Sequence, residues 1–218
     1  MQKVKYPRTY HLPYSPSVTD DDKTLQDDSQ FWNKVVSCSI KMDGENTTVY
    51  PNGEYHARSV DGYGKKWQSW LKQYIETWCH DIPENWRVCG ENLYAKHSIG
   101  YTFPDKTYLF QVFGIYNEKN ECLSIDDELE WCKMLGVRHV PVFYRGYYSK
   151  DAILTAFDAY KMYSKNDVEG FVVRVEESFP YFEFSRSTGK YVRAHHVQTD
   201  EHWTKFWTPN KVSWNENN

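Results

Sequence analysis

The segment Lys41-Met42-Asp43-Gly44-Glu45-Asn46 brings a lysine, carboxylates and a glycine together in one short stretch. The apolar residues before it, 35–40, have the composition of a β-strand, so Lys41 is predicted to lie at the end of that strand. A lysine amine in such a place can act as a nucleophile. The same segment also fits a polar turn after a strand, and alone it does not separate the two interpretations.

Residues that carry charge or could stack on a base follow this segment in a set order. The order is more specific than its members, because each member alone fits a surface charge or a core aromatic ring. The members are Arg58 in HARSVDG, Glu91 in VCGENLY, Phe113 in FQVFGIY, Glu169 in VEGFVVR and Lys190 in GKYVR.

This ordered set resembles the covalent nucleotidyltransferase superfamily, which comprises DNA ligases, RNA ligases and messenger RNA capping enzymes. The resemblance extends over about residues 35–195 and is closest to the RNA ligase branch. It implies that Lys41 becomes covalently bound to the nucleotide, and that Glu91 and Glu169 lie around the ribose and a divalent metal. It also implies a nucleotide-binding site that consists of Asp43, Asn46, Arg58, Glu91, Phe113, Glu169, Arg174, Lys190 and Arg193.

Attack of a lysine on phosphorus sets requirements for its surroundings. At an unperturbed pKa of about 10.4 the side chain is almost fully charged at neutral pH, whereas the nucleophile is the free amine. A cation near the amine lowers its pKa and offsets charge on the α-phosphate and on the departing pyrophosphate. We therefore expect a metal ion or basic side chains near Lys41. The candidate side chains are Arg58, Arg174, Lys190 and Arg193.

Two assignments within the set stay open on the sequence. Phe113 matches the superfamily's adenine-stacking aromatic residue, but the alternation of YLFQVFGIY lets either Val112 or Phe113 face inward. The last motif departs from the usual lysine-x-lysine form, because Arg193 follows Lys190 by three positions. We expect Lys190 to contact the α-phosphate and give Arg193 less weight.

The strands that must position these residues are predicted from composition and alternation. A hairpin with a tight primed turn is expected at Asn52 and Gly53, between residues 47–50 and 54–60. Further strands are expected at 35–40, 86–91 and 108–116, and in the stretches EGFVVRV, YFEFS and KYVRA.

The helices are predicted from three-and-four spacing and from end signals. Residues 65–80 carry an aromatic stripe that is expected to face the core. Ser124 with Asp127 resembles a capping pair for a helix that stops at Gly136, and Ser149 is expected to cap a helix through Tyr163. The mixture predicts an α+β fold, by resemblance a nucleotidyltransferase domain of antiparallel sheets flanked by helices.

Length and charge favour a globular protein without a general affinity for polyanions. The 218 residues are expected to form one domain, 1–218, with a loop-rich segment at 1–34 and a tail at 196–218. The acidic run at residues 20–22 is interpreted as a solvated loop. The net charge of −4 argues that any nucleic-acid site is a local basic groove. No C-terminal OB-fold of the kind that DNA ligases and capping enzymes usually carry is expected.

Several other classes are disfavoured. The five cysteines form no C-x-x-C pair, which argues against a disulfide framework or zinc ribbon and fits a reducing cytoplasm. No apolar stretch suits a signal peptide or a membrane span. Zinc-compatible ligands near the C-terminus match no compact zinc motif. These ligands are His195, His196, Asp200 and His202.

The resemblance thus implies an ATP-dependent RNA ligase that forms lysyl-AMP and seals RNA 5′-phosphate and 3′-hydroxyl ends. ATP and Mg²⁺ or Mn²⁺ are the implied cofactors. RNA ends, in a nicked duplex or as single strands, are the implied partners, and an accessory RNA-repair protein is a further candidate. Two alternatives remain: a DNA ligase or GTP-dependent capping guanylyltransferase, and a non-catalytic nucleotide- or RNA-binding module.

Overall fold

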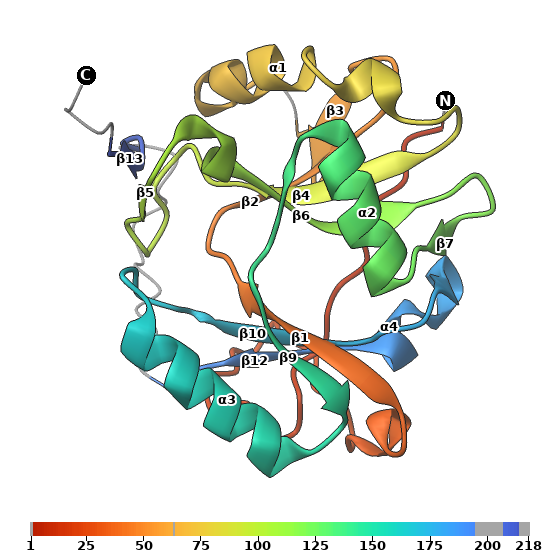
Figure 1. Cartoon of the computed structure of the whole chain (residues 1–218), viewed down its shortest axis with the longest axis vertical. Coiled ribbons are helices and arrows are strands. Elements are labelled where there is room, and N and C mark those ends of the chain that lie inside the picture. The colour runs from red at the N-terminus through yellow and green to blue at the C-terminus, as the bar shows by residue number, and fades with distance from the viewer. Residues whose placement is uncertain (1, 63, 195–206, 214–218) are drawn as a thin grey trace.

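The computed structural model describes residues 2–62, 64–194 and 207–213. Two β-sheets, built mainly of antiparallel strands, face each other across the middle of the molecule, and helices lie on their outer sides (Figure 1). The α+β class is therefore confirmed. A separate short pair, β5 (Thr102–Phe103) with β13 (Lys211–Val212), is parallel. None of the helices in these described ranges is long and apolar enough to cross a membrane.

The four-stranded sheet contains the predicted lysine strand. Its strands run in the order β12-β10-β1-β9, all antiparallel. The register pairs Lys41 of β1 with Gly170 of β10, which brings Glu169 beside the lysine. On the outer face, α3 (Lys150–Tyr163) packs Phe157 against Phe171, with ring centroids 4.9 Å apart. The strands are β1 (Val35–Lys41), β9 (Val142–Tyr147), β10 (Gly170–Val175) and β12 (Thr188–Val192).

The seven-stranded sheet supplies the opposite wall. Its main path is β11-β7-β6-β4-β2-β3, and β8 pairs with β6 in parallel. Apolar side chains from α1 (Ser69–Ile75) and α2 (Ile125–Leu135) form a core cluster with this sheet. The strands are β2 (Glu45–Val49), β3 (Tyr55–Ala57), β4 (Arg87–Asn92), β6 (Phe110–Tyr116), β7 (Glu121–Cys122), β8 (Arg138–His139) and β11 (Phe179–Pro180).

The capping signals of α2 and α3 are confirmed. The Ser124 hydroxyl accepts the backbone N–H of Asp127, and Gly136 ends α2 with a φ of 67°, which a residue with a side chain rarely adopts. Ser149 caps α3 in the same way by accepting the N–H of Ala152. The sequence predicts these helix ends correctly because each end depends on residues within one turn of the helix.

The helix predicted at 65–80 is shorter than expected. Only Ser69–Ile75 is α-helical, between 3-10 turns at Lys66–Gln68 and Cys79–Asp81. The Thr77 hydroxyl donates to the Tyr74 carbonyl, a local bond that competes with continuation of the helix. Trp78 is nevertheless buried, so the expectation that the aromatic stripe faces the core is confirmed.

The strand predicted for YFEFS is wrong. Residues 181–185 form a 3-10 turn, Tyr181–Glu183, followed by the first part of α4 (Phe184–Ser187). Phe184 and Ser187 are buried three positions apart, which is the spacing of a helix face.

The hairpin of β2 and β3 is confirmed, but its turn is not a primed one. Gly53 has a φ of 78°, whereas Asn52 is outside the left-handed region, and Tyr50 and Glu54 close a longer loop. Pro51 fixes a negative φ at the first turn position, so only the glycine becomes left-handed.

The segments expected to be loop and tail are partly built into the fold. Leu12 and Phe31 are fully buried, and His11 forms parallel bridges with Thr24 and Lys190. From the expected tail, Asn210 is buried and bonds to the backbone of residues 93 and 101. The zinc-compatible residues, His195, His196, Asp200 and His202, lie outside the described residues.

Candidate active site

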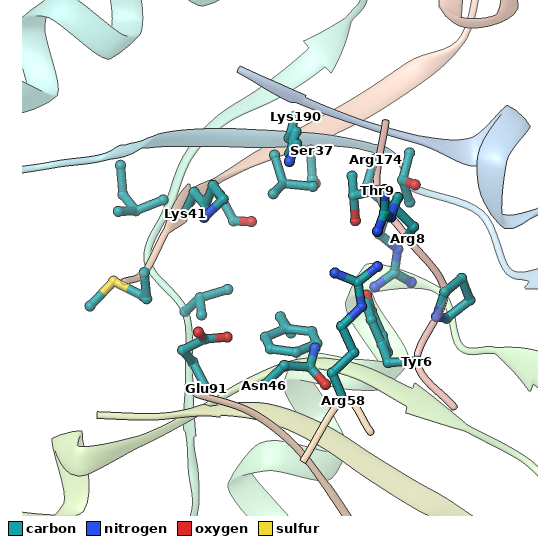
Figure 2. Close-up of a pocket in the computed structure, with 18 of the residues that line it drawn as sticks. Tyr6, Arg8, Thr9, Ser37, Lys41, Asn46, Arg58, Glu91, Arg174 and Lys190 are labelled. Carbon is teal, nitrogen blue, oxygen red and sulfur yellow. The ribbon is translucent and has the colours of Figure 1, made fainter. Parts of the chain in front are cut away.

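A cavity of about 320 Å³ lies between the two sheets. The four-stranded sheet contributes Lys41 and Lys190, and the opposite sheet contributes Asn46 and Glu91 (Figure 2). A volume of this order lies at the lower end of the range for small-molecule sites in proteins. Most of the predicted residues therefore come from both walls of one pocket, although they are far apart in the sequence. Asp43, Glu169 and Arg193 are not among the residues that line it.

Lys41 ends β1 with its amine beside carboxylates. Its Nζ donates to Glu169 Oε2 over 2.5 Å, and the lysine side chain keeps 27% exposure while that of Glu169 keeps 9%. Burial alone would lower the pKa of Lys41, but the negative charges of Glu169 and then Glu91 outweigh it and raise that pKa. In the protein by itself the neighbouring acids thus outweigh the basic side chains around the amine, although Lys190 lies close enough to interact with Lys41. The expected metal ion stays a prediction.

Glu91, on β4, is the most perturbed acid of the pocket. Burial, followed by the charge of Glu169, raises its pKa to about 8, against the opposing effect of Lys41. Its Oε1 accepts the backbone N–H of Gly44 over 3.1 Å. A largely buried carboxyl with a strongly raised pKa beside other acids favours a functional rather than a structural role.

Asp43 and Gly44 shape the turn after Lys41. The Asp43 carboxylate accepts the N–H of Ile99 over 2.7 Å, so it fixes a neighbouring loop and is not among the pocket-lining residues. A Cβ on Gly44 would lie 2.6 Å from the carbonyl oxygen of Asn92, which is too close for any side chain. The glycine is thus required by the approach of β4.

Asn46 and Phe113 present two different surfaces to the cavity. Asn46 Oδ1 is buried without a hydrogen-bond partner among the described residues, so it is available to a ligand. Phe113 is half-buried and lines the cavity, whereas Val112 is fully buried in the outer core cluster. The open question of which residue of β6 faces the pocket is settled in favour of Phe113.

The structure separates the two basic residues of the last motif. Lys190 lines the pocket and its Nζ lies 2.8 Å from Asp22 Oδ1. Burial, and to a smaller extent Lys41, lower the pKa of Lys190, although Asp22 opposes them. Arg193 instead binds the Asp167 carboxylate and the Val168 carbonyl and is not among the pocket-lining residues.

Arg174 and Arg58 also differ in their surroundings. Arg174 lines the pocket but is buried, with Nη1 2.7 Å from Glu128 Oε2, and its Nε has no partner among the described residues. Arg58 follows β3, is exposed, and extends into the cavity (Figure 2). The first is held by the protein, whereas the second is available to a ligand.

Sequence reasoning missed the N-terminal contribution to the pocket. Tyr6, Arg8, Thr9 and Asp22 line it, as does His139 of β8. The dense mixture of aromatic, proline and basic residues at 5–14 was the available signal, since a purely solvated loop has little use for aromatic rings.

The comparisons with known proteins identify the family of the chain. The family model described as RNA ligase matches residues 34–192, so the chain belongs to the RNA ligase family. That match confirms the resemblance seen in the sequence. No curated protein matches the chain.

Several solved structures share the fold at low sequence identity. An archaeal ATP-dependent RNA ligase aligns with 17% identity and a TM-score of 0.56, over 87% of this chain and 48% of that chain. A Naegleria gruberi RNA ligase mutant with ATP and Mn aligns with 15% identity and a TM-score of 0.52, over 86% and 60%. The chain therefore spans about half the length of the archaeal ligase.

An Aquifex aeolicus protein described provisionally as an ATP-dependent DNA ligase also aligns, with 18% identity and a TM-score of 0.52, over 76% of this chain and 46% of that one. Because RNA and DNA ligases share this fold, the fold alone does not identify the polymer.

Proposed function

We propose that this chain is an ATP-dependent RNA ligase that forms lysyl-AMP at Lys41. The observation that supports it is the place of Lys41 at the wall of the inter-sheet pocket, with Glu169 2.5 Å away and Glu91 on the same side (Figure 2). All three residues fall within the span that matches the RNA ligase family.

In the first step, the Lys41 amine attacks the α-phosphorus of ATP. An N–P bond forms, the bond from that phosphorus to the oxygen bridging the β-phosphate breaks, and pyrophosphate leaves. The ammonium must first release a proton to solvent, because its pKa is raised in the pocket. In this proposal Asn46 and Phe113, which line the pocket, hold the sugar and base of the same nucleotide, and Lys190 holds its α-phosphate.

Glu91, which lines the pocket, and Glu169, which binds Lys41 beside it, fit a divalent cation that arrives with the nucleotide. The described part of the chain has no group of three or more His, Cys, Asp or Glu residues that could hold a metal alone. Mg²⁺ is usually held by one or two carboxylates together with substrate phosphates, and Glu91 and Glu169 supply such a pair. Bound there, Mg²⁺ or Mn²⁺ would lower the pKa of Lys41 and offset charge on pyrophosphate.

RNA ends are the proposed acceptors. An oxygen of the RNA 5′-phosphate attacks the phosphorus of lysyl-AMP and the N–P bond breaks; a 3′-hydroxyl oxygen then attacks the 5′-phosphorus and AMP leaves. The ends can come from a nicked duplex or from single strands, with an accessory RNA-repair protein as a candidate partner.

The proposed location is the cytoplasm. The five free, buried cysteines suit a reducing compartment of this kind.

The donor is tested by incubating the chain with labelled ATP, GTP or NAD and Mg²⁺, followed by denaturing electrophoresis. A covalent label from ATP alone is the expected result. A label from GTP alone would assign the chain to capping chemistry, and no label from any donor would favour a binding module.

The polymer is tested with matched nicked substrates that differ only in the 2′-hydroxyls beside the break. Pre-adenylylated 5′ ends remove the first two steps from the measured rate. We expect faster sealing with RNA on the strand that provides the 3′-hydroxyl. Equal or faster sealing of all-DNA nicks would contradict the RNA assignment and leave lysyl-AMP formation intact.

A further inference from the structure

Asp22, the last residue of the acidic run 20–22, contacts the pocket instead of lying in a solvated loop. Its Oδ1 accepts the Lys190 amine over 2.8 Å, and the Asp22 and Lys190 side chains keep 20% and 17% exposure. Both residues line the cavity, and Figure 2 shows Lys190 at its wall. An acid from the N-terminal segment therefore holds the lysine of the last motif.

The backbone fixes Asp22 at this place. The Leu12 N–H donates to the Lys190 carbonyl over 2.7 Å, so the chain around Leu12 lies along β12. The His11 N–H donates to the Lys23 carbonyl over 2.7 Å, so the residue after Asp22 pairs with the same stretch. Main-chain hydrogen bonds therefore set the position of Asp22 relative to Lys190.

Other groups hold the second oxygen of the Asp22 carboxylate. Oδ2 accepts the Thr19 hydroxyl over 2.9 Å and the Thr19 backbone N–H over 3.2 Å, and it lies 3.2 Å from Nε2 of the buried His11. Burial, followed by the charge of Lys190, lowers the pKa of His11, so this ring is uncharged at neutral pH. Lys190 is thus the charged group that Asp22 binds, and contacts on both oxygens orient the carboxylate toward it.

The ion pair keeps a cation in a part of the pocket that disfavours it. Burial and the charge of Lys41 lower the pKa of Lys190, and Asp22 opposes both effects. Burial also disfavours the charge on Asp22, but hydrogen bonds from Lys190 and Thr19 outweigh it and hold the pKa of that carboxyl below its usual range. Asp22 therefore stays ionised and helps Lys190 to stay protonated.

We propose that Asp22 is a positioning residue for Lys190, because it holds the charged amine at the pocket wall in the place where that amine binds the α-phosphate of the nucleotide. A lysine ammonium has three donors, so one can stay on Asp22 while the others bind phosphate. Without such a partner the flexible lysine stem has many conformations. The role of the α-phosphate rests on the proposed function, whereas the contact between Asp22 and Lys190 rests on the geometry alone.

Single-turnover formation of lysyl-AMP by the full chain tests this role. Asp22→Asn keeps the shape of the side chain and should slow the reaction at saturating ATP by about three- to tenfold, because the amine is no longer held in place. The half-saturating ATP concentration should change by less than about twofold, since the lost contact acts in the transition state. Asp22→Glu keeps the charge and should recover most of the rate. Asp20→Asn is the matched control, because Asp20 is exposed in the same acidic run.

A double-mutant cycle separates this role from a general loss of structure. Lys190→Ala removes the amine that Asp22 holds, so Asp22→Asn should cause no further loss of rate in that background. An equal loss in both backgrounds, or a rate for Asp22→Asn equal to that of Asp20→Asn, would overturn the proposal. Faster adenylylation by Asp22→Asn would overturn it as well, because Asp22 would then compete with the nucleotide for Lys190.

Acetylation of the lysine amines, followed by mass spectrometry, tests the contact without ATP. Lys190 should be acetylated at least about threefold faster in Asp22→Asn than in the unaltered chain, because loss of the ion pair frees the amine and lowers its pKa. The exposed Lys119 should react equally in both chains. Equal acetylation of Lys190 in the two chains would show that Asp22 does not hold it.

Thermal unfolding establishes that each variant is folded before it is measured. If Asp22→Asn is not folded, Asp22→Ser takes its place in both experiments, because it also removes the charge and keeps a hydrogen-bonding group. If the unaltered chain forms no lysyl-AMP, the proposed function fails, but the acetylation rates still decide whether Asp22 positions Lys190.

Discussion

Two ion pairs beside the same pocket have similar geometry and different surroundings. Lys41 and Glu169 are 2.5 Å apart, with 27% and 9% of their side chains exposed, whereas Arg174 and Glu128 are 2.7 Å apart, with 8% and 0% exposed. Glu128 also lies 2.9 Å from His139 Nε2, so two basic residues surround one acid. Around Lys41 the balance is reversed, because several acids surround one amine.

This difference in charge balance separates the proposed reactive site from a structural ion pair. Burial opposes ionisation of Glu128, but Arg174 outweighs it and lowers the pKa to about 2. At the other pair, Glu91 is left without a cation of its own and its pKa rises to about 8. A surplus of carboxylates beside an open cavity is relieved by a ligand or metal, whereas a balanced, closed pair holds α2 against β10.

The largest expected effect is at Lys41. Lys41→Ala should abolish covalent labelling by ATP, because no other side chain takes over the attack. It should destabilise the chain less than loss of Glu128, because the Lys41 side chain keeps 27% exposure and leaves room for water beside Glu169. Gel labelling and urea unfolding measure the two effects. Normal labelling of this variant would remove Lys41 from the role of nucleophile.

The buried pair of Arg174 and Glu128 should matter more for stability than the Lys41–Glu169 pair. Glu128→Ala should lower the free energy of unfolding by about 3 to 5 kcal/mol, because it leaves Arg174 buried and unpaired. Glu130→Ala is the control, since Glu130 is exposed on the same helix. If Lys41→Ala destabilised the chain as much as Glu128→Ala, the distinction between the two pairs would be lost.

The Glu169→Ala and Glu91→Ala variants should fold normally, but their adenylylation should be slow. Losing one charge-assisted contact in the transition state costs about 2 to 4 kcal/mol, or on the order of thirty- to a thousandfold in rate. Single-turnover adenylylation measures this loss, with Glu177→Ala as an exposed control near the end of β10. Unchanged rates in both variants would exclude these carboxyls from the site.

The two acids should also give opposite pH dependence of stability. Glu91 has a raised pKa in the folded protein. Its contribution to the free energy of unfolding is complete below pH 4.5, its pKa in the unfolded chain, and is lost as pH rises through about 8. Glu128 has a lowered pKa, so its contribution to the free energy of unfolding is present above pH 4.5 and is lost as pH falls through about 2.

Glu91→Gln should therefore stabilise the chain, relative to the unaltered protein, more at pH ~9 than at pH ~6. We expect the difference in the free energy of unfolding between the two chains to grow by about 2 kcal/mol from pH ~6 to pH ~9, allowing for partial exposure of the side chain. Urea unfolding at the two pH values measures it. An identical pH profile in the variant and the unaltered chain would show that Glu91 is ionised in the folded protein.

The smallest effect is expected at Arg193. Arg193→Ala should change the adenylylation rate by less than about threefold, because its guanidinium binds Asp167 outside the pocket. Lys190→Ala should slow the reaction by at least about tenfold, since it removes a cation from the pocket wall. A larger loss at Arg193 would reverse the assignment of the last motif.

Local signals in the sequence predicted much of the fold. Ser124, Gly136 and Ser149 mark helix ends because a cap depends on neighbouring residues. The strand predicted for YFEFS was wrong because so short an aromatic stretch has no clear hydrophobic periodicity, and the burial of Phe184 depends on tertiary packing. Pro51 changed a turn that was predicted from Asn52 and Gly53 alone.

The residues that line the pocket were predicted where the ordered motifs carry a family resemblance, and missed where long-range pairing decides. Lys41 and Glu169 meet because β1 and β10 pair in one register, which the motif order anticipates. Arg8 and Asp22 reach the pocket because the backbone around His11 pairs with β12. The aromatic residues at 5–14 indicate that this segment packs against the protein, but nothing near them specifies the partner strand, so the acidic run at residues 20–22 is predicted to be a solvated loop.

The central claim is that Lys41 carries the nucleotide, and locating the adduct tests it most directly. The chain is incubated with ATP and Mg²⁺, digested, and its peptides are sequenced by tandem mass spectrometry. The account predicts one AMP group, attached through the amine of Lys41 and absent from Lys41→Ala. An AMP group found instead on Lys190 or another residue, with Lys41 unmodified, would contradict it.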